Sequence, residues 1–101
     1  MPGNPVMDDD SETIGILLID GYPIIPFSCV VDSLRSANRL SGKQLYRWEY
    51  YAPDAGPVSA SCGIEVPTQP FSSAGKLNAL LVVAPNTAQD FKHAPIRLLV
   101  W

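Results

Sequence analysis

Two uninterrupted apolar runs dominate the pattern of hydrophobic and polar positions along this chain. They cover residues 13–19 (TIGILLI) and residues 79–84 (ALLVVA). A run without polar alternation is typical of a strand that is buried on both faces, as in a parallel sheet. We therefore predict two central parallel strands, the first of which ends in a turn at Asp20 and Gly21.

An amphipathic helix is predicted between the runs, over residues 26–40. Apolar side chains recur there at three- and four-residue spacing, which places them on one helix face. Pro26 fits the first turn, where a missing N–H does no harm, and Gly42 fits the position just past the end. The expected apolar face consists of Phe27, Val30, Val31, Leu34, Ala37 and Leu40.

The remaining segments predict shorter elements. Residues 46–52 are rich in aromatics and form a strand, and residues 53–57 have strong turn chemistry. Residues 58–61 and 64–66 flank Cys62 and Gly63, which indicates a hairpin with a two-residue loop. Residues 67–78 are irregular, with one helical turn near residues 72–75. A second helix is expected from residue 94 to residue 101.

The order of these elements predicts an α/β fold. Strands that alternate with helices favour a parallel sheet with helices on both faces and right-handed crossovers. Both a flavodoxin-like and an amidotransferase-like sheet meet this description. A chain of 101 residues is one domain at most.

Charge and composition exclude several classes of protein. Four of the ten acidic residues lie in residues 1–12, which we predict to be a flexible acidic tail, so the remaining residues are close to neutral. No apolar run is long enough to span a membrane, and the start lacks the pattern of a signal peptide, so we expect a cytoplasmic protein. The one basic cluster comprises Arg35, Arg39, Lys43 and Arg47. The end of a helix explains this cluster at least as well as phosphate contact does.

A ligand site is expected at one edge of the sheet. In open α/β sheets, ligands bind beyond the carboxyl ends of the strands. Two loops occupy that edge, and their candidate ligand-binding residues are Asp20, Gly21, Tyr22, Pro85, Asn86 and Thr87. A simple tight turn accounts for Gly21 more readily than a role in ligand binding does. The first loop has one glycine and two prolines, so it is not a phosphate-binding loop, and we expect no nucleotide or other cofactor.

Nucleophilic catalysis has little support in the sequence. Cys29 is predicted to be a small buried thiol beside the apolar helix face. Cys62 is expected at the hairpin tip without a basic partner, and His93 is expected in a loop before the last helix. A catalytic thiol needs a base within hydrogen-bonding reach, so no catalytic residue is assigned.

The carboxylates do not point to catalysis or to metal binding either. They are scattered over different predicted elements, and a local ion pair with Arg35 accounts for Asp32. His93 is the only histidine, and the two cysteines lack metal-ligand spacing, so no metal site is predicted.

Several segments, in order and at matching spacing, resemble a known family. They are residues 14–21, residues 30–42 (which end in LRSANRLSG), residues 46–48 (YRW) with 53–56 (PDAG), and residues 58–63 (VSASCG). The chain resembles the start of the sensor domain of AraC-type transcriptional regulators, a branch of the ThiJ/PfpI superfamily. The resemblance implies a flavodoxin-like, class I glutamine amidotransferase-like α/β domain, joined to a C-terminal helix-turn-helix domain that binds DNA.

Two departures from the superfamily's enzymes imply a domain without catalytic activity. Hydrolytic members place a glutamate at the start of the first helix, where this chain has residues 24–28 (IIPFS). They also carry a Gly-Gly pair where this chain has Ala84, Pro85 and Asn86, and proline has no N–H to offer an oxyanion. The nucleophile of such an enzyme is expected beyond Trp101.

The leading hypothesis is therefore a non-catalytic ligand-sensing and oligomerising part of a transcriptional regulator. Residues 13–101 are expected to be the N-terminal half of its domain, with an apolar strand edge at residues 79–84 that favours self-association, such as a dimer. The resemblance implies a small amino-acid-like or amine effector, and DNA contact only through the absent C-terminal domain. The alternatives are the N-terminal half of a ThiJ/PfpI-type hydrolase or hydratase, and a stand-alone flavodoxin-like binding module.

Overall fold

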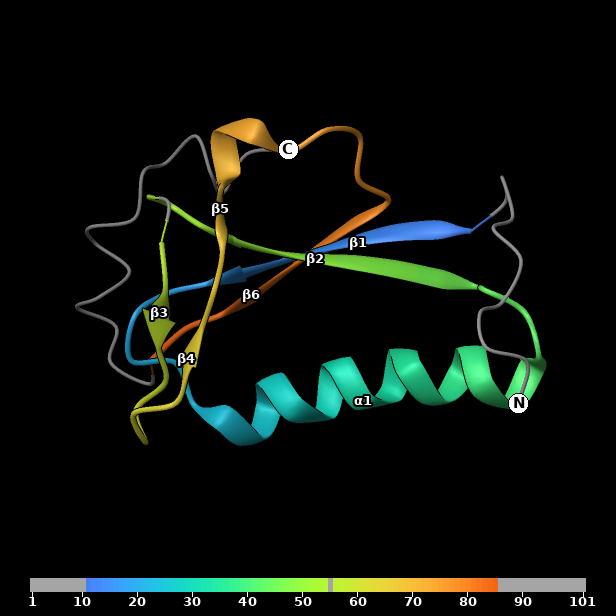
Figure 1. Cartoon of the computed structure of the whole chain (residues 1–101), viewed down its shortest axis with the longest axis horizontal. Coiled ribbons are helices and arrows are strands. Elements are labelled where there is room, and N and C mark those ends of the chain that lie inside the picture. Colours follow the sequence, from blue (N-terminus) through green and yellow to red (C-terminus); the bar gives the residue numbers. More distant parts are fainter. Residues whose placement is uncertain (1–10, 55, 86–101) are drawn as a thin grey trace.

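The computed structural model describes residues 11–54 and 56–85. Its main sheet has four parallel strands in the order β5-β2-β1-β6, and a separate hairpin pairs β3 with β4 (Figure 1). This arrangement confirms the predicted α/β class. The elements are β1 (Glu12–Leu18), α1 (Ile24–Ser41), β2 (Tyr46–Ala52), β3 (Val58–Ser59), β4 (Glu65–Val66), β5 (Gln69–Pro70), the 3₁₀ helix η1 (Phe71–Ser73) and β6 (Ala79–Val83).

Strand β1 lies at the centre of the described sheet. It pairs in parallel with β2 and with β6, so that Ile14 lies opposite both Trp48 and Ala79. The five residues from Ile14 to Leu18 are all buried, which confirms the reading of the first apolar run as a strand covered on both faces. Strand β6 is the outermost strand on its side among the described residues.

Helix α1 covers one face of the sheet (Figure 1). Phe27 is buried, and Val30, Val31 and Leu34 pack against the core as predicted. Two predictions for this helix are wrong, because Leu40 is 84% exposed and Cys29 is exposed. A helix turns by about 100° per residue. Cys29, two positions after Phe27, therefore lies on the opposite side of α1, and Leu40 falls outside the stripe that Phe27 and Leu34 define.

The ends of α1 follow from local chemistry. The helix begins at Ile24, two residues earlier than predicted, and Pro26 lies in its first turn as expected. Gly42 ends it with φ of 71°, and its N–H donates to Asn38 O and Arg39 O. Glycine adopts this left-handed conformation without strain, which explains its place after the helix.

Asn38 joins the last turns of α1 to the beginning of β2. Its Oδ1 accepts hydrogen bonds from the backbone N–H groups of Leu45 (2.8 Å) and Tyr46 (2.9 Å). Its Nδ2 donates to Tyr46 O at 2.9 Å. The side chain therefore fixes the turn that carries the chain from the helix back to the sheet.

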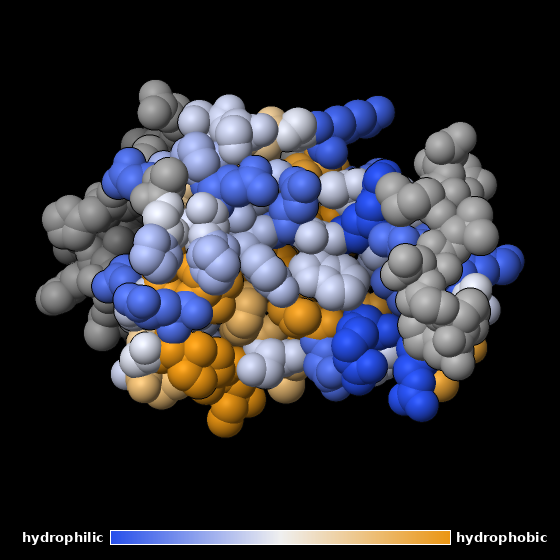
Figure 2. Space-filling view, viewed as in Figure 1, coloured by the Kyte–Doolittle hydropathy of each residue, from blue (hydrophilic) through white to orange (hydrophobic). Residues whose placement is uncertain are grey.

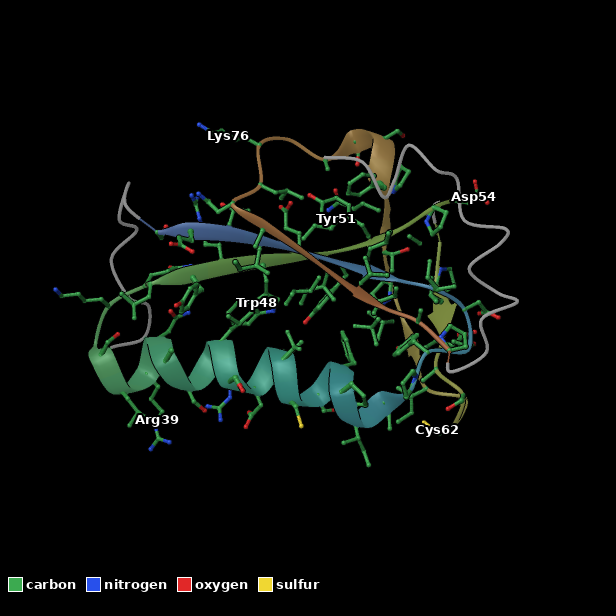
Figure 3. The ribbon with its side chains drawn as sticks, turned by 180° about the vertical axis from the view of Figure 1, so that it is seen from behind. Arg39, Trp48, Tyr51, Asp54, Cys62 and Lys76 are labelled. Carbon is green, nitrogen blue, oxygen red and sulfur yellow. The ribbon has the colours of Figure 1, made fainter. Side chains whose placement is uncertain are left out.

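The second face of the sheet is covered by η1 and the loop that follows it (Figure 1). Leu17 and Tyr51 are buried there against Phe71 and Leu77. Figure 3 shows Tyr51 on this side of β2, while Trp48 points toward α1. A Cβ at Gly15 would lie 2.6 Å from Leu77 Cδ1, so the Leu77 side chain packs directly on this glycine. The helical turn near residues 72–75 is found at Phe71–Ser73.

The hairpin differs slightly from the prediction. Val58 pairs with Val66 and Ser59 with Glu65 in antiparallel register. Ala60 N donates to Ile64 O, and the loop spans three residues, 61–63, rather than two. Gly63 has φ of 94°, which is the conformation that such a loop requires at its last position. The predicted acidic tail up to residue 10, His93 and the helix over 94–101 lie outside the described residues.

Candidate functional site

The loops that follow β1 and β6 lie side by side at the carboxyl edge of the sheet. Ile19 N donates to Val83 O at 3.0 Å, which extends the pairing of the two strands to their ends. Tyr22 N then donates to Ile19 O at 3.0 Å and closes a turn in which Gly21 has φ of 86°. A Cβ at Gly21 would lie 3.5 Å from Pro85 Cγ, so the two loops are in contact.

The β3–β4 hairpin reaches the same edge, which the sequence did not indicate. Gly21 N donates to Ser59 O at 2.8 Å, and Ser61 N donates to Tyr22 O at 2.8 Å. A short parallel bridge joins Tyr22 to Ala60. The residues that form this contact are far apart in sequence and are joined by single hydrogen bonds. No periodic pattern of residues therefore predicts it.

Asp20 supplies the carboxylate of this edge. The residue is exposed, and its Oδ1 accepts a hydrogen bond from Ser59 N at 3.2 Å. No ion pair to Asp20 exists within residues 11–54 and 56–85. An exposed carboxylate of this kind can bind a cationic group or a hydrogen-bond donor.

Tyr22 is placed differently from the other candidates, because its side chain lies in the core. It is fully buried, and its ring packs edge to face on Phe27 with 5.4 Å between centroids. Its hydroxyl is buried without a hydrogen-bond partner among the described residues. Burial raises the pKa of this hydroxyl above its ordinary value, and the charge of nearby Cys62 adds to the increase.

Two of the six candidate residues, Asn86 and Thr87, lie outside the described residues. Pro85 is half-buried beside Gly21. The structure therefore brings Asp20, Gly21, Tyr22 and Pro85 to one edge, with Asp20 as the exposed charged group.

The start of α1 lies at the same edge. Pro23 precedes the helix without a side-chain cap, and the first turn contains no acidic residue. The N–H groups of such a turn carry a partial positive charge. The edge thus presents one carboxylate and one weakly positive helix end.

The described residues offer no assembled catalytic or metal centre. Cys29 and Cys62 are both exposed and belong to different elements, the helix and the hairpin tip. Within the described part of the chain, no group of three or more histidine, cysteine or acidic residues could hold a metal ion. Asp32 forms the predicted ion pair with Arg35, at 2.9 Å on the exposed side of α1. No helix in this part is both long and apolar enough to cross a membrane.

Comparison with known proteins relates this chain to regulators of transcription. No protein-family model matches it. It is 40% identical over 65 residues to the HTH-type transcriptional regulator GbdR of Pseudomonas aeruginosa. The aligned region is 64% of this chain and 18% of that protein. It is 41% identical over 56 residues to CdhR of the same organism (55% of this chain, 16% of that protein). It is 32% identical over 65 residues to GlxA of Rhizobium meliloti (64% and 20%).

The fold has a counterpart among solved structures. An AraC family transcriptional regulator from Pseudomonas putida matches with a TM-score of 0.65 and 18% identity, over 78% of this chain and 45% of that one. The chain spans about a fifth of the length of the curated relatives it matches. These findings agree with the resemblance that the sequence indicated: the chain is similar in sequence to part of several HTH-type transcriptional regulators, and its α/β fold matches part of a solved AraC family regulator.

Proposed function

We propose that this chain is part of a non-catalytic, effector-sensing and oligomerising domain of an AraC-type transcriptional regulator. The observation that carries the proposal is its 40% identity with a regulator of transcription over 65 residues. Residues 13–101 would form the N-terminal half of the sensing domain, after an acidic tail that gives way to β1 at Glu12. DNA contact would be made by a helix-turn-helix domain elsewhere in the regulator, and such a protein acts in the cytoplasm.

The effector site of this proposal is the carboxyl edge of the sheet. Asp20 would bind the positive group of an amine or amino-acid-like effector, since its carboxylate is exposed and in no ion pair within the described part of the chain. Gly21 and Pro85 would adjoin the carboxylate at the surface, and the buried Tyr22 would support their loops from beneath. Asn86 and Thr87 are proposed as further ligand-binding residues. Ligands of open parallel sheets gather at this edge, which supports the placement.

The proposed lack of catalysis rests on the residues at the same edge. The start of α1 carries no carboxylate, and Pro85 supplies no N–H where an oxyanion would need one. Both cysteines are exposed on separate elements. An edge of this composition suits recognition of a ligand rather than its conversion.

The oligomer of this proposal would use the outer edge of β6. Edge strands are usually protected by charged residues or by proline. Strand β6 (Ala79–Val83) contains neither. Leu81 and Val82 are each 38% exposed. Light scattering tests this part, and a monodisperse monomer of 10.9 kDa would contradict it.

An NMR titration of the chain tests the effector site. Amides of Gly21 and Ser59 are followed while a panel of amines and amino acids is added, with an uncharged alcohol as the control ligand. The proposal expects saturable shifts at these amides with at least one amine or amino acid. Shifts confined to α1 or to η1 would place the ligand elsewhere and contradict it.

A further inference from the structure

The hairpin, formed by β3, β4 and their turn (residues 58–66), is separate from the main sheet. Within the described part of the chain, its hydrogen bonds to the rest of the molecule all go to the edge loop, residues 19–22. They are Gly21 N to Ser59 O, Ser61 N to Tyr22 O, and Ser59 N to Asp20 Oδ1. The edge loop therefore holds the hairpin at three points within three consecutive residues.

The hairpin is fixed at its base and free at its tip. Val58 and Ala60 are buried in the core, with 7% and 4% exposure. The tip residues 61–64 are all exposed, and Figure 3 shows Cys62 pointing outward near the beginning of α1. A segment that is attached at its base by a few hydrogen bonds opens at a lower free energy than the core does.

Asp20 belongs to both the attachment and the proposed ligand site. Its Oδ1 accepts the Ser59 N–H at 3.2 Å, and the same exposed carboxylate would meet an amine. A cationic group that takes Oδ1 competes with the Ser59 N–H for that oxygen, whereas one that takes only Oδ2 does not. Binding at Oδ1 would weaken the hold on Ser59 while the two backbone bonds remain.

We propose that the hairpin is a conformational reporter of the edge loop, which shifts when Asp20 engages a ligand. This inference rests on the proposed function, because it assigns the ligand to Asp20. Its consequence is a change in surface. The tip carries exposed Ile64 and the first turn of α1 carries exposed Ile25, and Figure 2 shows apolar surface at this end of the molecule. A shift of the hairpin would thus alter an apolar surface rather than a charged one.

The chain contains its own probe for this motion. Cys29 and Cys62 are its only cysteines, and Cys62 lies at the moving tip. In a Cys29→Ser background, the rate of reaction of Cys62 with Ellman's reagent reports the position and freedom of the tip. Amide hydrogen exchange at Ala60 and Ser61 reports the base, and exchange at Ile16 reports global unfolding.

Two substitutions at Asp20 separate the hydrogen bond from the charge. Asp20→Ala removes the acceptor and the charge, whereas Asp20→Asn removes the charge but keeps an oxygen that can accept the Ser59 N–H. We expect Asp20→Ala to accelerate both the Cys62 reaction and Ser61 exchange about three- to tenfold, as the loss of one hydrogen bond implies. Asp20→Asn is expected to stay within about twofold of the parent. Asp32→Ala, which removes an exposed carboxylate from α1, is expected to change neither rate.

Equal rates of the Cys62 reaction and of Ser61 exchange in Asp20→Ala and Asp20→Asn would overturn the proposal. Amide exchange at Ile16 that accelerates as much as exchange at Ser61 would also overturn it, because the whole protein would then be unfolding. This comparison needs no ligand, so failure to find an effector does not affect it. The ligand step has its own readout. Any amine or amino acid that shifts the Gly21 resonance should change the Cys62 rate in the parent and leave it unchanged in Asp20→Ala. A ligand that shifts Gly21 and leaves the parent's Cys62 rate unchanged would refute the coupling while leaving the effector site in place.

Discussion

Replacing Asn38 with alanine should destabilise the protein more than any other polar substitution on α1. The side chain makes three hydrogen bonds to the backbone at the start of β2, two through Oδ1 and one through Nδ2. Removing it leaves the N–H and the C=O of Tyr46 without these partners. Tyr46 is half-buried, so water replaces them only in part.

The size of the expected loss in the free energy of unfolding follows from the three hydrogen bonds of Asn38. Each contributes about 1 kcal/mol. The bond to Leu45 N contributes less, because that N–H also donates to Lys43 O at 3.1 Å. Alanine is a better helix former than asparagine by about 0.6 kcal/mol, which offsets part of the loss. The expected net loss in the free energy of unfolding is about 2 kcal/mol. In a domain of this size, that loss lowers Tm by roughly 8–16 °C.

Urea unfolding followed by tryptophan fluorescence measures this loss, because Trp48, one of the two tryptophans, lies between the sheet and α1 (Figure 3). Ser33→Ala is the matched control, since Ser33 is exposed on the same helix, and it should change stability by less than about 0.5 kcal/mol. A loss below about 0.5 kcal/mol in Asn38→Ala would refute the view that this side chain fixes the turn into β2.

Three further predictions concern the sheet and the cysteines. Burial, and after it the hydrogen bond to Glu49, raise the pKa of Tyr51 to about 12 from 10.0. The unfolded chain therefore loses this proton first, so the stability that Tyr51 contributes should be fully present below pH 10 and be lost between pH 10 and about 12. Alkaline urea titrations should show a smaller fall in Tyr51→Phe, and an identical fall would contradict the assignment. Gly15→Val should cost about 1–3 kcal/mol in urea unfolding, because the added side chain must displace the side chains of Leu77, Leu80 and Tyr51, and a neutral result would show that these side chains move aside freely. Ester and amide substrates should show no turnover above buffer, and turnover that is lost on replacing Cys62 with serine would mean that the chain is an enzyme.

Elements defined by local pattern could be predicted from the sequence. The run that forms β1 is buried on both faces, and the glycine that ends α1 has the positive φ that its position demands. Cys29 could also have been placed by pattern, because a residue two positions after the buried Phe27 lies on the opposite side of the helix, and the prediction of a buried thiol did not apply that spacing. Strand β5 consists of two residues, one of them a proline, and exists only because Tyr51 and Ala52 offer it an edge.

The candidate site was predicted in part for the same reason. The topology of a parallel sheet brings Gly21 and Pro85 to one edge, and this rule needs only the order of the strands. The docking of Ser59 and Ser61 onto that edge depends on three single hydrogen bonds across about forty residues of sequence. Contacts of this kind leave no periodic signal in a single sequence.

The proposed recognition of a positively charged effector at Asp20 is tested most directly by isothermal titration calorimetry. The amine or amino acid with the largest NMR shifts is titrated into the parent chain, Asp20→Ala and Asp54→Ala, the last being an exposed carboxylate at the end of β2. We expect at least about tenfold weaker binding for Asp20→Ala, since a charge-assisted hydrogen bond is worth about 1.5–3 kcal/mol, and unchanged binding for Asp54→Ala. Binding to Asp20→Ala as tight as to the parent would contradict the proposed recognition.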